Sequence, residues 1–414
     1  MAIKGADLLH VGNRVLLERA QTAGPGQVNL APEKVYELGN YRSIATIYDI
    51  PDLTFSVDSL DASTSIEALL CGADYSASVV GDVYDLSRAR PLDVLSEFKR
   101  GRSDSNPYNV AGSVALPYLT LEQVNYRFGL KEKAQQTAVL KGDSIFYNPG
   151  SAFQERSAGT ALAGQTVVLS NPAFPYRGAV IDGVKYVLGV KLASGLRLRY
   201  GTDYTETVTG ANPDGSRSVS VVVTAAVSLT DFIDVVYSSP TVAQYPAASH
   251  TLPQVTRPAA IRGRDIEVFV GGIALANRWT SVQAVTCDYR VTLQKDEEFG
   301  NNQLVDQDFD VPAVNGTIQV KPRDVGELLT RVRQAAGIAS TSEVVGALST
   351  IPLEVVFVLH SPQDGSILKS LVVPDARITV PAYSGRVQQK LDVTFNFESD
   401  TGQLQVIHGA KPAA

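Results

Sequence analysis

The sequence is poor in the residues that most often carry catalysis or metal binding. Its 414 residues include two cysteines, four histidines, one methionine and one tryptophan. Neither Cys71 nor Cys287 has a second cysteine or a histidine at metal-ligand spacing, so a zinc site is not indicated. We expect both to be buried free thiols, although the sequence alone leaves a disulfide between them open.

No recognisable catalytic motif is present either. His10, His250, His360 and His408 are far apart, and none lies in a motif with a nucleophile or a metal partner. The chain has no phosphate-binding glycine-rich loop, no nucleophile elbow and no zinc signature. The stretch GTDYT at residues 201–205 could suggest calcium or carbohydrate contact, but a β-turn that leads into a strand explains it more simply. We therefore expect a protein that is not an enzyme and that needs no cofactor or metal.

Charge and long apolar runs are also scarce. Charged residues make up 19% of the chain, the net charge is −7, and there is no basic tract, so affinity for nucleic acid through counterion release is not expected. No run approaches the roughly 20 apolar residues of a membrane span. Lys4, Asp7, His10 and Arg14 interrupt any signal-peptide core near the start. We expect the chain to fold in the cytoplasm of the cell that makes it, without membrane insertion.

What is abundant favours β-structure. Hydrophobic residues make up 44% of the chain, and Val, Thr, Ser, Gly and Tyr are frequent, which is typical of short strands and turns. Three segments near residues 52–58, 284–294 and 391–398 alternate polar and apolar residues, which predicts strands with one buried and one wet face. The wet faces are predicted to be acidic and rich in hydroxyl groups, and a solvent-exposed sandwich face remains the simpler alternative. Their polar residues are Asp52, Thr54, Ser56, Asp58, Thr286, Asp288, Arg290, Thr292, Asp392, Thr394, Asn396 and Glu398.

An internal repeat covers most of the chain. Four landmarks recur in the same order with offsets between 257 and 261 residues, and this collinearity favours duplication over chance. We predict two homologous modules at residues 1–143 and 258–414, separated by an inserted small β-sandwich of Ig-like type with a Pro-rich exit linker at 144–257. The matched pairs are 36–40 with 297–301, 49–51 with 310–312, 113–117 with 370–374, and 133–137 with 390–394.

The insert and the helices are predicted from local patterns. In the insert, a turn with glycine at positive φ is predicted at residues 212–215. Each module has one helix candidate, at residues 65–70 and 324–336, and residues 91–100 form a further candidate because Pro91 precedes apolar residues at helical spacing. Strands of the insert are expected at 166–169, 185–190, 196–200, 204–209, 218–224 and 233–237.

Residues 38–40, 50–57 and 66–70, together with the closing stretch LDVTFNFESDTG at 391–402, resemble the major tail tube proteins of tailed bacteriophages. The resemblance covers both modules and excludes the insert. It implies a mainly β fold in which each module is a β-sandwich flanked by a helix and donates one four-stranded sheet to a ring. Six such sheets close a barrel around a lumen, and stacked rings form the tube.

This chain departs from the usual one-module pattern, so the resemblance implies homotrimeric, pseudo-hexameric rings of a long non-contractile tail, with a hexamer as the alternative. The polar residues above would face the lumen, through which double-stranded DNA passes without specific binding. Tail terminator, tape measure and distal tail proteins would be partners, and the protein would reside in the virion. Two other functions stay open: a carbohydrate-binding or adhesion protein, and the inner tube of a contractile injection system.

Overall fold

The computed structural model is mainly β. Among the residues that the structure describes, α1 (Ser65–Leu70) is the one helix seen in full, beside the short turns η2 (Leu86–Arg88) and η3 (Gly263–Asp265). The structure describes residues 3–11, 15–16, 20–29, 32–36, 43–48, 52–60, 63–72, 79–100, 110–130, 132–157, 164–177, 183–192, 194–224, 232–241, 261–274, 282–296, 306–321, 329–330, 333–334, 337, 351–384 and 392–411.

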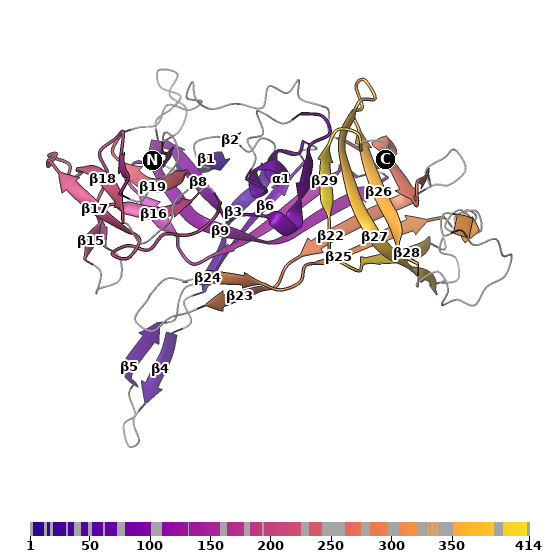
Figure 1. The fold of residues 1–414 in the computed structure, drawn as a ribbon, viewed down its shortest axis with the longest axis horizontal. Coiled ribbons are helices and arrows are strands. Elements are labelled where there is room, and N and C mark those ends of the chain that lie inside the picture. The colour runs from indigo at the N-terminus through magenta and orange to yellow at the C-terminus, as the bar shows by residue number, and fades with distance from the viewer. Residues whose placement is uncertain are drawn as a thin grey trace.

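An antiparallel sheet of eight strands runs through the molecule (Figure 1). Its strand order is β3-β6-β10-β9-β22-β25-β28-β27, so four strands from the first part of the chain lie beside four from the last part. The strands are β3 (Ala20–Asn29), β6 (Asp52–Ser59), β10 (Gln135–Gly142), β9 (Val110–Gly129), β22 (Val282–Arg290), β25 (Ala313–Val320), β28 (Asp392–Ser399) and β27 (Ile367–Ser384).

A second layer covers one face of this sheet. β9 and β27 are long enough to serve both layers: their first halves pair in the second layer and their second halves in the eight-stranded sheet. The second-layer orders are β2-β1-β8-β9-β11 and β21-β20-β26-β27-β29-β7. The added strands are β1 (Ile3–Val11), β2 (Val15–Leu16), β8 (Leu92–Arg100), β11 (Phe146–Asn148), β20 (Ile266–Val270), β21 (Ile273–Ala274), β26 (Leu353–His360), β29 (Gln405–His408) and β7 (Val83–Asp85).

One hydrophobic core lies between the layers and extends through both halves. It includes Phe55 of β6, Tyr126 of β9, Phe357 of β26 and Phe397 of β28. The apolar residues of the alternating strands therefore point inward, as the period of two predicts, and the polar ones lie on the other face.

Both long strands change layer at the same kind of corner. β8 pairs with β9 through a register shift between Leu116 and Leu119, and β26 pairs with β27 through a shift between Val373 and Ala376. A proline follows Leu116 and Val373 directly, and Tyr118 has the only positive φ of the described non-glycine residues. Irregular pairing and a missing N–H allow a strand to bend there.

Two hairpins are inserted between consecutive strands of the eight-stranded sheet, at corresponding places in the chain. β4 (Pro32–Tyr36) and β5 (Ser43–Tyr48) lie between β3 and β6 in the chain, and β23 (Leu293–Asp296) and β24 (Asp306–Phe309) lie between β22 and β25. The β4–β5 hairpin projects well away from the body of the molecule (Figure 1).

Of the helix predictions, 65–70 is confirmed as α1. The prediction at 91–100 is wrong, because these residues form β8, which pairs with β1 and β9. Val94 of β8 faces the main core and Leu95 faces the insert, so both faces are buried and no alternation was visible in the sequence. In the range 324–336, residues 329–330 and 333–334 are helical. The remaining residues of this range lie outside the described part of the chain.

The insert consists of two three-stranded sheets with a shared core. Their orders are β12-β19-β16 and β13-β18-β17, and Val187, Val221 and Val235 are among the fully buried core residues. The strands are β12 (Ser151–Arg156), β13 (Thr166–Val168), β16 (Val187–Leu192), β17 (Tyr204–Thr209), β18 (Ser218–Val223) and β19 (Ile233–Ser239), with a hairpin of β14 (Tyr176–Arg177) and β15 (Val184–Lys185).

Most strand predictions in the insert are confirmed, as is the turn between β17 and β18, where Gly215 has φ +84 and its N–H donates to Asn212 O at 3.0 Å. The predicted strand at 196–200 is wrong: its residues make only isolated bridges. Gly195 and Gly201 flank it with positive φ, and the chain turns at both before a strand can extend.

The insert is fixed to the first half by buried charge pairs. Lys191 Nζ lies 2.7 Å from Asp93 Oδ2, and Arg197 Nη1 lies 2.7 Å from Asp143 Oδ2, with all four side chains at most 10% exposed. Removing one partner of such a pair leaves an uncompensated buried charge. The insert and the first half are therefore held in one arrangement.

Candidate functional site

The outer face of the eight-stranded sheet carries a continuous polar surface. Directly paired residues of antiparallel strands project to the same side, so one row can be followed through the pairings from the first strand to the last. This row consists of Asp58, Thr137, Asn125, Asp288, Asn315, Glu398 and Arg377, and its first member, Asp58, pairs with Thr22 of the edge strand β3.

The structure brings most of the predicted polar residues together on this face. In β6, Asp52, Thr54, Ser56 and Asp58 alternate with buried residues. Two of the predicted residues, Thr292 and Asp392, are not placed on this face. Thr292 follows the end of β22 and is exposed outside that strand, and Asp392 begins β28 but its side chain lies outside the described part. The members in β22 and β28 are Thr286, Asp288, Arg290, Thr394, Asn396 and Glu398, none of them buried.

The face is not as acidic as the sequence suggested. β9, β10 and β27 add the cations Arg127, Lys141 and Arg377, which the prediction did not include because it considered other strands. The described part of the face is therefore mixed in charge. Each added cation has a carboxylate neighbour: Glu132 at 3.7 Å, Glu122 at 2.9 Å and Asp400 at 2.6 Å, respectively.

Neutral side chains hold several acidic groups of the face in place. Gln123 Nε2 donates to Asp288 Oδ1 at 2.7 Å across the β9–β22 junction, and Thr137 Oγ1 donates to Asp58 Oδ1 at 2.6 Å. These neighbours come from adjacent strands of the sheet, so the polar side chains form a cross-strand network with defined positions.

The two four-stranded halves meet at the β9–β22 junction. These strands pair antiparallel over seven residues of each, from Gly129 opposite Ala284 to Gln123 opposite Arg290. At the two ends of the sheet, β3 pairs only with β6 and the second half of β27 only with β28 among the described strands. These two edges present backbone groups that can pair with another strand.

A second contact between the halves lies in the other layer. β7 of the first half pairs with β29 of the second, and Tyr84 lies opposite Val406. Two side chains support this contact: Tyr289 Oη donates to Leu86 O at 2.9 Å, and Gln403 Nε2 donates to Asp85 Oδ2 at 2.8 Å.

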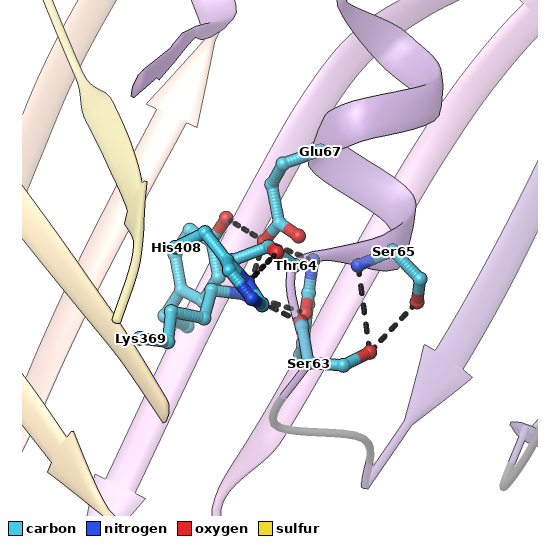
Figure 2. A network of polar contacts seen from close by, with 8 residues as sticks. Ser63, Thr64, Ser65, Glu67, Lys369 and His408 are labelled. Carbon is cyan, nitrogen blue, oxygen red and sulfur yellow. Dashed lines mark hydrogen bonds and ion pairs between the residues drawn. The ribbon is translucent and has the colours of Figure 1, made fainter. Parts of the chain in front are cut away.

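A buried polar network also joins the two halves (Figure 2). Lys369 of β27 forms an ion pair with Glu67 of α1, and their side chains are 1% and 0% exposed. Tyr126 Oη and Gln136 Nε2 also donate to Glu67 Oε1, the latter at 2.8 Å, and the Lys369 ammonium lies 5.0 Å from the centre of the Tyr126 ring. Burial and then the Glu67 carboxylate raise the pKa of the Tyr126 phenol, so it stays a neutral donor.

At the edge of this network, the Nδ1 atom of His408 lies 2.8 Å from Thr64 Oγ1. Burial lowers the pKa of His408, whereas Asp82 opposes this shift. The neutral imidazole is therefore favoured in the folded protein.

Both cysteines are free thiols, and Cys287 is buried while Cys71 is half-buried. Burial, followed by the charges of Glu67 and Asp85, raises the pKa of Cys71 to about 12, and burial also raises that of Cys287. The expectation of buried thiols thus holds in full for Cys287 and in part for Cys71.

In the part of the chain that the structure describes, no group of three or more His, Cys, Asp or Glu side chains could hold a metal ion. The described helices are also too short to cross a bilayer. No protein-family model and no curated protein matches this chain.

Proposed function

We propose that the chain is the subunit of a tube, built from two copies of one module, and that it forms the tail tube of a bacteriophage. The β9–β22 junction is the observation that carries this proposal, because it joins two four-stranded sheets edge to edge within one chain. Among the described strands, the two ends of the sheet have free edges. The edge strand β27 has the position in the second half that β9 has in the first, and the edge strand β3 has the position in the first half that β22 has in the second. The same junction can therefore repeat between copies.

Details of the pairing support the duplication. The register shifts at Leu116–Leu119 and Val373–Ala376 are both offset by 257 residues. The hydroxyl of Ser113 donates to Gly150 O at 2.8 Å, and that of Ser370, again 257 residues later, donates to Gly409 O at the same distance. Shared irregularities of this kind are stronger support than shared strands, because bulges are specific features of a fold.

A head-to-tail junction of this kind generates a closed ring when the rotation between neighbours closes. Three chains would supply six sheets, which gives a homotrimeric, pseudo-hexameric ring without unpaired strand edges. Because half of the junctions are already formed within chains, fewer partners lose translational and rotational freedom for each ring. Stacked rings would then form the tube.

The polar face would line the lumen. Its acidic groups repel phosphate, and three of its cations, Arg127, Lys141 and Arg377, already have carboxylate neighbours, so they offer little attraction to DNA. Duplex DNA would pass without binding, and no covalent chemistry is involved.

Electron microscopy of the purified protein, with light scattering for the mass, tests the proposal. We expect rings or stacked tubes with three-fold symmetry and six similar lobes. A monomer at all concentrations that binds glycans would favour the adhesion alternative, whereas rings of six chains would contradict the trimer.

A further inference from the structure

Within the chain, β7 covers an edge of the second half. β7 pairs with β29 so that Tyr84 and Val406 lie opposite each other, and both side chains are buried, at 4% and 0% exposure. His408 extends the contact, because its N–H donates to Asp82 O at 2.9 Å.

β11 holds the place of β29 in the first half. Each of these two strands pairs with the first half of a long strand, Tyr147 opposite Val114 in one case and Val406 opposite Leu371 in the other. A glycine lies three residues after Tyr147 and three after Val406, and its carbonyl accepts the serine hydroxyl described above. Tyr147 and Val406 are therefore corresponding positions.

The two positions differ in their surroundings. Val406 is fully buried, whereas Tyr147 is 70% exposed, among the most exposed large apolar side chains of the described residues. β11 pairs only with β9 among the described strands, so its other edge lacks the covering strand that β7 provides to β29.

We propose that this edge of β11, with Tyr147, is a docking surface for a second copy of the chain, which contributes the segment between its β25 and β26. That segment has the same place in chain order as α1 and β7, which lie between β6 and β8. In the first half, this segment supplies β7, which pairs with β29 of the second half of the same chain. By analogy, the segment of the second half would contact β11 in the first half of the next copy. The inference rests on the proposed ring and adds an outer-layer contact to the β27–β3 junction.

The docking between copies has a different chemistry from the docking within the chain. At the offset of 257 residues that relates Ser113 to Ser370, Lys369 corresponds to Gly112, so no buried ammonium is available. Pro149 precedes Gly150 as His408 precedes Gly409, and proline lacks the N–H that His408 donates. The β11 side therefore lacks the counterparts of the Lys369 ammonium and of the His408 N–H, and what it offers a second copy is its unpaired strand edge and the exposed Tyr147.

Photocrosslinking of the full chain tests this surface. Tyr147 is replaced by the photoreactive residue p-benzoylphenylalanine, and ring fractions containing equal amounts of isotopically light and heavy chains are irradiated. We expect intermolecular products, recognised by mixed isotope labels, that join position 147 to a peptide within residues 321–352. The same residue at Val168, which is 68% exposed on β13 of the insert, is the matched control and should give no product with that peptide.

Two outcomes separate this inference from the proposed function. Rings whose position 147 links elsewhere, or to nothing, would overturn the docking surface and leave the tube proposal standing. A protein that forms no rings at all would overturn both. As a second variant, Tyr147→Lys should lower the fraction of chains in rings at a given concentration, while Val168→Lys should not, and equal effects of both would contradict the inference.

Discussion

Glu67 and Lys369 form an ion pair with almost no solvent exposure, although 302 residues separate them in the sequence. The carboxylate belongs to the helix of the first half and the ammonium to a strand of the second half. The pair therefore fixes one half against the other at the interior of the molecule, where breaking it would leave a charge without compensation.

We predict that Lys369→Met destabilises the protein by roughly 3–5 kcal/mol, because Glu67 stays buried without its partner. The double variant Glu67→Gln with Lys369→Met should recover most of this loss. Urea denaturation followed by circular dichroism measures the effect. The exposed pair Arg377–Asp400 provides the control, since Arg377→Gln should change stability by less than about 1 kcal/mol. Equal losses in the single and double variants would show that the charges are not coupled.

The neutral state of His408 predicts that the stability of the folded protein depends on pH. Its pKa is lower in the folded than in the unfolded chain, so the unfolded chain binds the proton more readily. This contribution to stability is present above the unfolded pKa of about 6.5 and is lost as the pH falls below it. The urea midpoint of the wild type should therefore fall more steeply between pH 7 and 5 than that of His408→Gln, whose amide can still bond Thr64. Identical slopes would contradict the assignment.

Thiol reactivity should report on the same packing. The raised pKa values of Cys71 and Cys287 leave little thiolate at pH 8, and Cys287 is also sealed from solvent. We expect slow reaction with a disulfide reagent in the native protein and rapid reaction of two thiols per chain in urea. Rapid native labelling of Cys287 would mean that the β22–β25 region opens readily.

Much of this architecture was predictable where one face of a strand is buried and the other wet. Alternation located β6, β22 and β28. The duplication inferred from the order of landmarks stays a prediction. β8 was mistaken for a helix because the insert buries its second face, which removes the alternation that identifies a strand. A single sequence does not show which surfaces a second domain will cover.

The buried network was missed for a related reason. Lys369 stands in the run ILKSLVV, and a lone lysine among apolar residues is a signal that a buried partner exists. Nothing in the sequence identifies Glu67 as that partner, because the pairing depends on how the two halves pack. Arg127 and Arg377 of the polar face were overlooked because β9 and β27 cross from one layer to the other, so neither strand has one constant alternation.

The polar face makes the proposed transport role testable. Asp58→Lys and Asp288→Lys would each place an ammonium in the row of side chains that follows the sheet, where it can bind the phosphates of passing DNA. We expect virions that carry either variant to assemble tails of normal length and to eject their genome more slowly, with the delay reduced at high salt because counterions screen the attraction. Val168→Lys adds a cation on the insert instead and should leave ejection unchanged. Fluorescence of a DNA-binding dye during triggered ejection gives the rate. Normal, salt-independent kinetics in both variants would show that the polar face does not line the channel.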